Sequence, residues 1–228
     1  MPENDDYENF LVVDDSEANR LLLSFMLQEL GYQTDEAENG EKAVEMALEF
    51  DYSAIFMDIN MPIMDGSEAT ETLRSINFDK PIFACSAEDN SNKIKQLINL
   101  GFTDFICKPI EPQKVKGLLE KNSITPEKTN PLNDENYQHK LDQLSKRFVE
   151  NIPVILTKID RAVEKKSIAD LKRIGHKLKG TASQFGFDRV AKIGRDIEAA
   201  INKSKIPLAI EKAIFLKAEL NKIRESKQ

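Results

Sequence analysis

The sequence has little of what marks a secreted protein. Its 228 residues include only two cysteines, Cys85 and Cys107, and both lie inside apolar, strand-like runs. This number and spacing exclude a disulfide framework or a cysteine-based metal site, so we expect two small core residues in a reduced compartment. The first nine residues are acidic and contain no apolar stretch of the kind found in signal peptides.

Long apolar runs are also missing. The longest cluster, residues 21–27, is far shorter than the roughly 20 residues that cross a bilayer. We therefore expect a soluble, cytoplasmic protein that does not bind membranes. Aromatic residues are few among the lysines of the second half, and no motif for binding ATP or DNA is visible, so neither a nucleic-acid partner nor an ATP-binding kinase domain is expected.

The charges divide the chain into two contrasting halves. Residues 1–120 carry 9 basic and 25 acidic residues, a net of −16, whereas residues 121–228 carry 23 basic and 14 acidic ones, a net of +9. The length suits two domains of ordinary size. The scattered lysines of the second half favour a solvated helical surface or docking to an acidic protein over nucleic-acid binding.

The first half alternates between short apolar runs and helical patterns. Five strand-helix pairs are expected: strands at 10–13, 33–37, 53–57, 81–85 and 104–107, and helices at 16–30, 40–50, 67–75, 90–100 and 112–120. Strict alternation of this kind predicts an α/β domain with a five-stranded parallel, doubly wound sheet.

Polar side chains follow four of these strands. They are Asp14, Asp15, Asp58, Ser86 and Lys108. The carboxyl ends of parallel strands meet at one edge, where open α/β sheets bind ligands. Three crowded carboxylates repel one another unless a cation lies between them, and an oxygen-only cluster suits Mg²⁺. With Lys108 and Ser86 opposite, Asp58 is a candidate nucleophile for phosphoryl transfer.

These residues resemble the receiver domains of two-component response regulators, especially the single-domain chemotaxis type. The resemblance covers about residues 7–120. The matching motifs are Phe10-Leu11-Val12-Val13-Asp14-Asp15, Met57-Asp58-Ile59-Asn60-Met61-Pro62-Ile63-Met64-Asp65-Gly66, Ser86-Ala87-Glu88 and Lys108-Pro109.

The resemblance implies a role for each matching residue. Asp58 would be phosphorylated, Asp14 and Asp15 with the backbone carbonyl of Asn60 would help it bind Mg²⁺, and Lys108 would contact the phosphoryl oxygens. Ser86 and Phe105 would form the switch pair, although Phe105 replaces the common tyrosine and lacks its hydroxyl. The Lys108-Pro109 bond is a candidate cis peptide.

Two other functions fit the same stretch. A phosphatase of the haloacid-dehalogenase type also forms an aspartyl phosphate at a strand end, but it needs an acid two residues later, where Asn60 cannot exchange a proton. A phospho-switched protein-binding module would use Asp58 only to change a docking surface. A phosphotransfer protein of the receiver type implies no turnover of a small molecule.

The second half has no strand pattern. Residues 121–136 are polar and contain two prolines, which predicts an exposed linker. Helices are then expected at 137–148, 153–165, 168–185, 188–202 and 207–224. Their apolar stripes can be buried only against one another, so residues 137–226 are predicted to form an all-α helical bundle.

The helix at 168–185 carries the histidine of interest. Its apolar face excludes His176, which is therefore expected to be exposed, together with Lys179 and Gly180. Glycine inside a helix costs about 1 kcal/mol relative to alanine, so Gly180 suggests a surface cleared for close approach. An exposed imidazole among lysines suits a carrier of phosphoryl groups.

His176-Lys177-Leu178-Lys179-Gly180 resembles the central motif of histidine phosphotransfer (HPt) domains, over about residues 137–226. The resemblance also implies that Glu198, on the flank of the next apolar stripe, orients His176. Together the two resemblances imply a phosphorelay intermediate: Asp58 accepts a phosphoryl group from a sensor histidine kinase or another phosphohistidine donor, and His176 carries it to or from the receiver domain of another response regulator.

Overall fold

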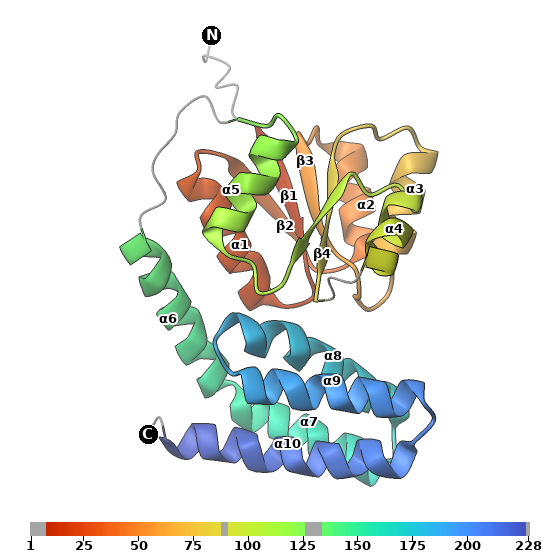
Figure 1. Cartoon of the computed structure of the whole chain (residues 1–228), viewed down its shortest axis with the longest axis vertical. Helices are drawn as coiled ribbons and strands as arrows, with labels where there is room; N and C mark the ends of the chain where they lie inside the picture. The colour runs from red at the N-terminus through yellow and green to blue at the C-terminus, as the bar shows by residue number, and fades with distance from the viewer. Residues whose placement is uncertain (1–7, 88–90, 126–133, 227–228) are drawn as a thin grey trace. The chain divides into compact units, whose positions relative to one another are not determined.

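The chain forms two compact units, residues 1–137 and 138–228. The computed structural model describes residues 8–87, 91–125 and 134–226 (Figure 1). The first unit contains a sheet and its helices, and the second contains helices alone.

A five-stranded parallel sheet forms the centre of the first unit. Its strands are β1 (Asn9–Val13), β2 (Gln33–Ala37), β3 (Ala54–Asp58), β4 (Ile82–Ser86) and β5 (Asp104–Cys107). They lie in the order β2-β1-β3-β4-β5, and every neighbouring pair is parallel. The chain moves from β1 to β2 on one side and returns to β3 on the other, so the order reverses between β1 and β3.

Five helices cover the two faces of this sheet. They are α1 (Glu17–Glu29), α2 (Gly40–Glu49), α3 (Gly66–Ser75), α4 (Ser91–Asn99) and α5 (Pro112–Lys121). In Figure 1, α1 and α5 lie on one face and α2, α3 and α4 on the other. The expected α/β class and parallel sheet are confirmed, and every strand and helix lies within two residues of its expected bounds.

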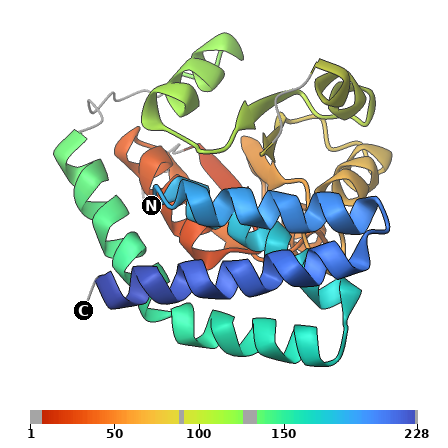
Figure 2. The same ribbon diagram turned by 60° about the horizontal axis from the view of Figure 1, so that its bottom comes forward.

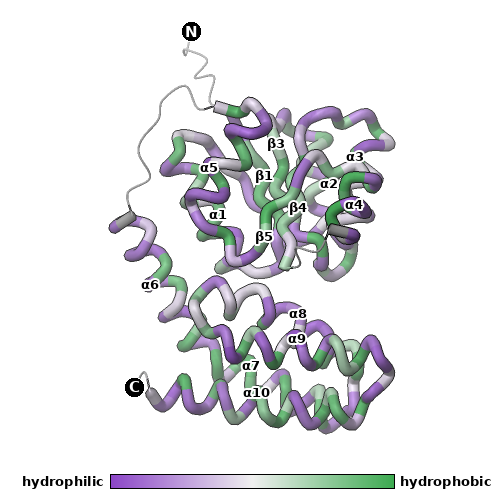
Figure 3. Tube along the Cα trace, in the orientation of Figure 1, coloured by the Kyte–Doolittle hydropathy of each residue, from purple (hydrophilic) through white to green (hydrophobic). Residues whose placement is uncertain are grey.

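The apolar side chains of the strands fill both faces of the sheet. Leu11, Ile55 and Met57 belong to a core cluster that includes residues of α2, α3 and α4. Alternate residues point to the opposite face, where the rings of Phe10, Phe56 and Phe83 follow one another at centroid distances of 6.2 and 5.2 Å. Burial on both faces explains why β1, β3 and β4 are almost continuously hydrophobic (Figure 3), whereas the edge strand β2 is mostly polar.

The second unit is a bundle of antiparallel helices. The chain after the sheet domain forms five described helices: α6 (Asp134–Glu150), α7 (Ile152–Glu164), α8 (Ile168–Gln184), α9 (Asp188–Asn202) and α10 (Ile206–Ser226). Helices α9, α10 and α7 run side by side (Figure 2). Fully buried side chains on four helices share one core: Ile159, Leu171, Val190, Ile197 and Leu216. The expected all-α bundle is therefore confirmed.

The segment expected to be a linker, residues 121–136, is partly helical. Helix α5 continues to Lys121, and α6 begins at Asp134 rather than at Tyr137. The start of α6 was missed because its first three residues are polar and show no apolar periodicity. Residues 126–133 lie outside the described part of the chain.

The two cysteines differ in their surroundings. Cys85 is buried in the central strand β4, whereas Cys107 is only half-buried because β5 is an edge strand. The expectation of two core cysteines is thus wrong for Cys107.

Among the described helices, none combines the length and apolar character needed to cross a membrane.

Candidate functional sites

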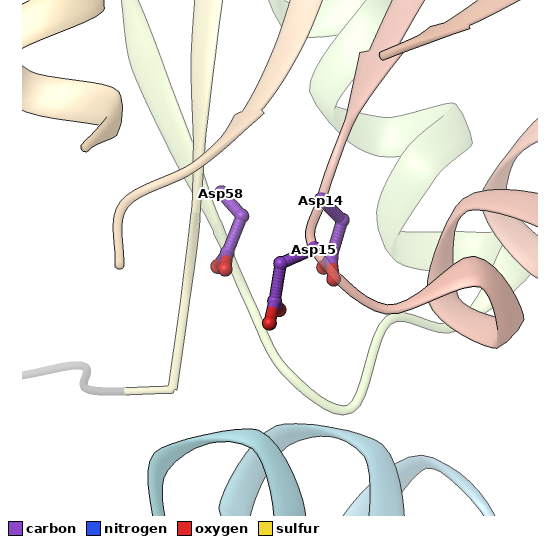
Figure 4. A group of neighbouring side chains, drawn as sticks. All are labelled: Asp14, Asp15 and Asp58. Carbon is purple, nitrogen blue, oxygen red and sulfur yellow. The ribbon is translucent and has the colours of Figure 1, made fainter. Parts of the chain in front are cut away.

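The first candidate site lies at the carboxyl ends of β1 and β3, where the strand order reverses. Asp58 is the last residue of β3, and Asp14 and Asp15 directly follow β1. In Figure 4 the three side chains point into the same space. Their carboxylates offer oxygens that all lie within 4.8 Å of one another, and Asp14 and Asp58 are buried. In open α/β sheets this position is where ligands bind.

Lys108 approaches the same cluster from the end of β5. Its Nζ donates to Asp14 Oδ2 at 2.6 Å and to Asp58 Oδ1 at 2.9 Å, with only 7% of the lysine side chain exposed. Burial by itself lowers the pKa of Lys108, but the charges of Asp14 and Asp58 outweigh it, so the pKa is raised and the ammonium stays charged.

A backbone hydrogen bond helps to fix the position of Lys108. Its N–H donates to the carbonyl of Ser86 at 2.7 Å, which ties the end of β5 to the end of β4. The following bond to Pro109 is a cis peptide, as the sequence suggested.

The carboxylate of Asp14 accepts hydrogen bonds from several neighbouring residues. Besides Lys108, its carboxylate accepts from the N–H of Ser16 at 2.8 Å and from the side-chain amide of Asn19, at 3.1 Å to each oxygen. Ser16 itself makes no side-chain cap of α1. Sequence reasoning missed Asn19, because its role depends on how the first turn of α1 folds back over the strand end.

The loop after β3 packs tightly against Asp58. The carboxylate of Asp65 accepts from the N–H groups of Ser67 and Glu68, both at 2.9 Å, and so caps α3. The N–H of Gly66 donates to the carbonyl of Ile59 at 2.8 Å. A Cβ at Gly66 would lie 2.1 Å from the carbonyl oxygen of Asp58, so only glycine fits beside this residue.

The remaining residues of the first site take different positions. Asn60 follows β3 with an exposed side chain. Ser86 is buried at the end of β4, and Phe105 is half-buried, with its ring packed against the core cluster. Glu88, the last residue of the Ser86-Ala87-Glu88 motif, lies outside the described residues.

The second candidate site lies between α8 and α9. Nδ1 of His176 is 2.7 Å from Oε1 of Glu198, so the expected proximity of these side chains is present. Burial by itself raises the pKa of Glu198, but the hydrogen bond from His176 and the charge of Lys179 outweigh it, and the pKa is lowered. Glu198 is therefore an ionised acceptor, and an ionised carboxylate at this distance accepts a hydrogen bond from the N–H of Nδ1.

The side chains of this site are less exposed than expected. His176 is 22% exposed rather than fully open, and Gly180 is half-buried. Lys179 is only 8% exposed, with its Nζ 3.4 Å from Glu198 Oε2. Placing Lys179 on the surface was wrong, because the periodicity of α8 alone does not reveal how closely α9 covers it.

Comparisons with known proteins agree with this division. The family model "Response regulator receiver domain" matches residues 10–120, and the model "Hpt domain" matches residues 143–226. Chemotaxis protein CheY of Halobacterium salinarum is 41% identical over 105 residues, which are 46% of this chain and 88% of CheY. The chain therefore belongs to the response regulator receiver family, and its receiver is followed by an HPt domain.

Further relatives include a longer protein and a solved structure. Signal transduction histidine-protein kinase BarA of Shigella flexneri is 25% identical over 213 residues, covering 82% of this chain and 23% of BarA. The chain thus spans about a quarter of that relative. Chemotaxis protein CheY4 of Vibrio cholerae has a TM-score of 0.48 and 30% identity, covering 50% of this chain and 98% of its own. A receiver joined to an HPt domain supports a role in phosphorelay signalling.

Proposed function

We propose that the chain is a phosphorelay intermediate in which Asp58 and His176 each carry a phosphoryl group. Asp58 accepts it from a phosphohistidine donor, such as a sensor histidine kinase. His176 passes it to, or takes it from, the aspartate of a receiver domain. The observation that carries this proposal is the presence in one chain of the Asp58–Lys108 cluster and the His176–Glu198 pair.

At the receiver, the chemistry is an in-line displacement at phosphorus. A carboxylate oxygen of Asp58 attacks, the bond from phosphorus to the donor's imidazole nitrogen breaks, and that nitrogen keeps the electron pair. Lys108, already charged and 2.9 Å from Asp58, neutralises charge on the transferred group. Ser86, at the end of β4, and Phe105, the second residue of β5, are the proposed switch pair that senses the phosphoryl group.

The donor set of the receiver site fits Mg²⁺. Three carboxylates face one ammonium, which leaves negative charge for a further cation to balance, and all the available ligands are oxygens. Asp15, Asp58 and the carbonyl of Asn60 are the proposed ligands, and Asp14 acts beside them through its contacts to Lys108 and Asn19. When bound, Mg²⁺ supplies charge neutralisation and orientation of the phosphoryl oxygens.

At the bundle, the reacting atom is Nε2 of His176. Because Glu198 holds the proton on Nδ1, the lone pair of Nε2 can attack an aspartyl phosphate, forming a P–N bond as the P–O bond breaks. The ring becomes positively charged in this step, and the carboxylate of Glu198 stabilises that charge.

Labelling with phosphate tests both sites. We expect the full chain to take label from a small acyl phosphate when Mg²⁺ is present, and to lose it with a chelator or with Asp58→Asn. A phosphorylated receiver domain should transfer label that is acid-labile and alkali-stable to His176, but not to a His176→Gln variant. Label that persists in Asp58→Asn argues against the receiver role. Label on Asp58 with none ever on His176 would favour a phospho-switched binding module.

A further inference from the structure

Helices α8 and α9 touch backbone to backbone at a pair of buried glycines. A Cβ on Gly175 would lie 2.9 Å from the carbonyl oxygen of Gly194 and 3.3 Å from the side chain of Ile197. A Cβ on Gly194 would lie 2.5 Å from the carbonyl oxygen of Gly175 and 3.1 Å from the backbone nitrogen of Lys179. Most of these neighbours are main-chain atoms, which cannot move aside as a flexible side chain would.

The glycine pair lies directly beside the His176 site. Gly175 precedes His176 and is four residues before Lys179, while Gly194 is four residues before Glu198. Residues four apart share one face of a helix. The same contact surface therefore carries the glycine pair, Lys179 one turn further along α8 and Glu198 one turn further along α9, and the side chains of Lys179 and Glu198 approach to 3.4 Å.

Glycine in these positions has a cost for the helices themselves. Both residues lie inside long helices, where alanine would favour the helical conformation. The gain must come from the close approach that glycine alone permits. This approach brings Oε1 of Glu198 within 2.7 Å of Nδ1 of His176 and leaves Lys179 only 8% exposed.

We propose that Gly175 and Gly194 are positioning residues that set the α8–α9 spacing at which Glu198 holds the tautomer of His176. An added methyl group at either position moves the helices apart. The hydrogen bond to Nδ1 then lengthens, and the proton redistributes between the two ring nitrogens. The consequence for phosphoryl transfer rests on the proposed function, whereas the consequence for the tautomer does not.

The direct test is Gly194→Ala in the full chain, with ¹⁵N NMR of the imidazole rings as the readout. We expect His176 to carry its proton on Nδ1 in the native chain and to lose that preference in the variant. His139, the second histidine, is exposed on α6 and serves as an internal reference. Transfer of label to His176 should slow by about 10- to 10²-fold, the loss of rate expected when reacting groups are misplaced by about 1 Å.

Two control variants separate positioning from loss of packing. Gly117→Ala makes the same chemical change in α5, where a Cβ meets nothing within 4 Å, and should leave the His176 tautomer unchanged. Ile159→Val removes one methylene from the buried core on α7 and should lower the stability of the bundle without changing the tautomer.

A double-mutant cycle tests whether the glycines act through Glu198. In a Glu198→Ala background, Gly194→Ala should change the transfer rate by less than about twofold, because the contact that it disturbs is already gone. If Gly194→Ala does not fold, Gly175→Ala, whose Cβ makes milder contacts, replaces it. A folded variant with an unchanged tautomer, or fully additive rate effects, overturns the proposal. If the native chain never labels His176, the proposed function fails, and the tautomer measurement still decides the role of the glycines.

Discussion

The two candidate phosphoryl carriers are assembled in opposite ways. In the receiver, Lys108 and Asp14 meet across 94 residues of sequence, and the site requires the ends of three strands at one edge. In the bundle, His176 and Glu198 are 22 residues apart and come from two consecutive helices. The receiver site therefore depends on the whole sheet, whereas the bundle site depends on the spacing of one helix pair.

The chemistry of each carrier explains this difference. Asp58 is a carboxylate among other carboxylates, so the fold must first neutralise charge, through Lys108 and a site that fits a cation. In the proposed function His176 reacts through the lone pair of Nε2, so the fold must supply orientation and a fixed tautomer, for which one carboxylate is enough. In the proposed function, an acceptor site whose ligands fit a cation is thus joined to a carrier that reacts through a ring nitrogen.

The largest effect is expected from Gly66→Ala in the receiver. The added methyl would meet the carbonyl oxygen of Asp58 at 2.1 Å and so displace the reactive residue itself. We expect labelling from an acyl phosphate to fall by 10²-fold or more, and the free energy of unfolding to fall by about 1–3 kcal/mol. Gly117→Ala is the matched control, because its Cβ has open space and should stabilise α5 by up to about 1 kcal/mol. Equal labelling in both variants would contradict the predicted fit.

Sequence patterns predicted the first site better than the second. Asp14, Asp58 and Lys108 could be placed together because a parallel sheet brings all its strand ends to one edge, whatever the detailed packing. Asn19 could not be placed, since its contact with Asp14 depends on how α1 begins. In the bundle, periodicity indicated which faces are buried but not how closely the helices approach. The sequence pattern therefore predicted neither the contact of Gly175 with Gly194 nor the burial of Lys179.

The next largest effect is expected from Glu198→Ala in the bundle. Loss of the carboxylate removes both the hydrogen bond that fixes Nδ1 and the charge that stabilises the phosphorylated ring. Transfer to His176 should slow by up to about 10²-fold, while circular dichroism shows an intact bundle. Glu198→Gln keeps an oxygen acceptor without the charge, so its rate should lie between the two. A rate within twofold of the native value would leave Glu198 as an ordinary surface charge.

A smaller effect is expected from Asn19→Ala in the receiver. The side-chain amide of Asn19 donates to both carboxylate oxygens of Asp14. The same carboxylate accepts from Lys108 and so orients the lysine. By analogy with residues that support metal ligands, its loss should weaken Mg²⁺ binding by about 10-fold in calorimetric titration. Gln28→Ala on the same helix is the control, because its amide donates to the hydroxyl of Thr34 at 2.9 Å and not to a residue of the acidic cluster. Unchanged affinity in Asn19→Ala would show that Asp14 needs no such support.

The smallest effect is expected from Lys121→Ala, which tests whether an ion pair with one exposed partner matters as much as the buried pairs that define the two sites. Lys121 Nζ lies 2.6 Å from Asp104 Oδ2, but the lysine side chain is 69% exposed, against 7% for Lys108. An exposed ammonium contributes little, so the free energy of unfolding should fall by less than about 1 kcal/mol. Asp104 keeps its bonds from the N–H of Phe105 and the amide of Asn122 in this variant.

The contribution of Asp104 to the free energy of unfolding is expected to decrease as the pH falls. Burial by itself raises the pKa of Asp104, but the bonds from Lys121, Phe105 and Asn122 outweigh it, so the folded-state pKa is lowered. Asp104 therefore stabilises the receiver above its unfolded pKa of about 3.9, and this contribution is lost as the pH falls through the lower folded value. Lys121→Ala should weaken the loss of stability on acidification, measured by urea unfolding between about pH 2 and 5. A destabilisation as large as that of Gly66→Ala would show that a pair with one exposed partner contributes as much to stability as a buried contact.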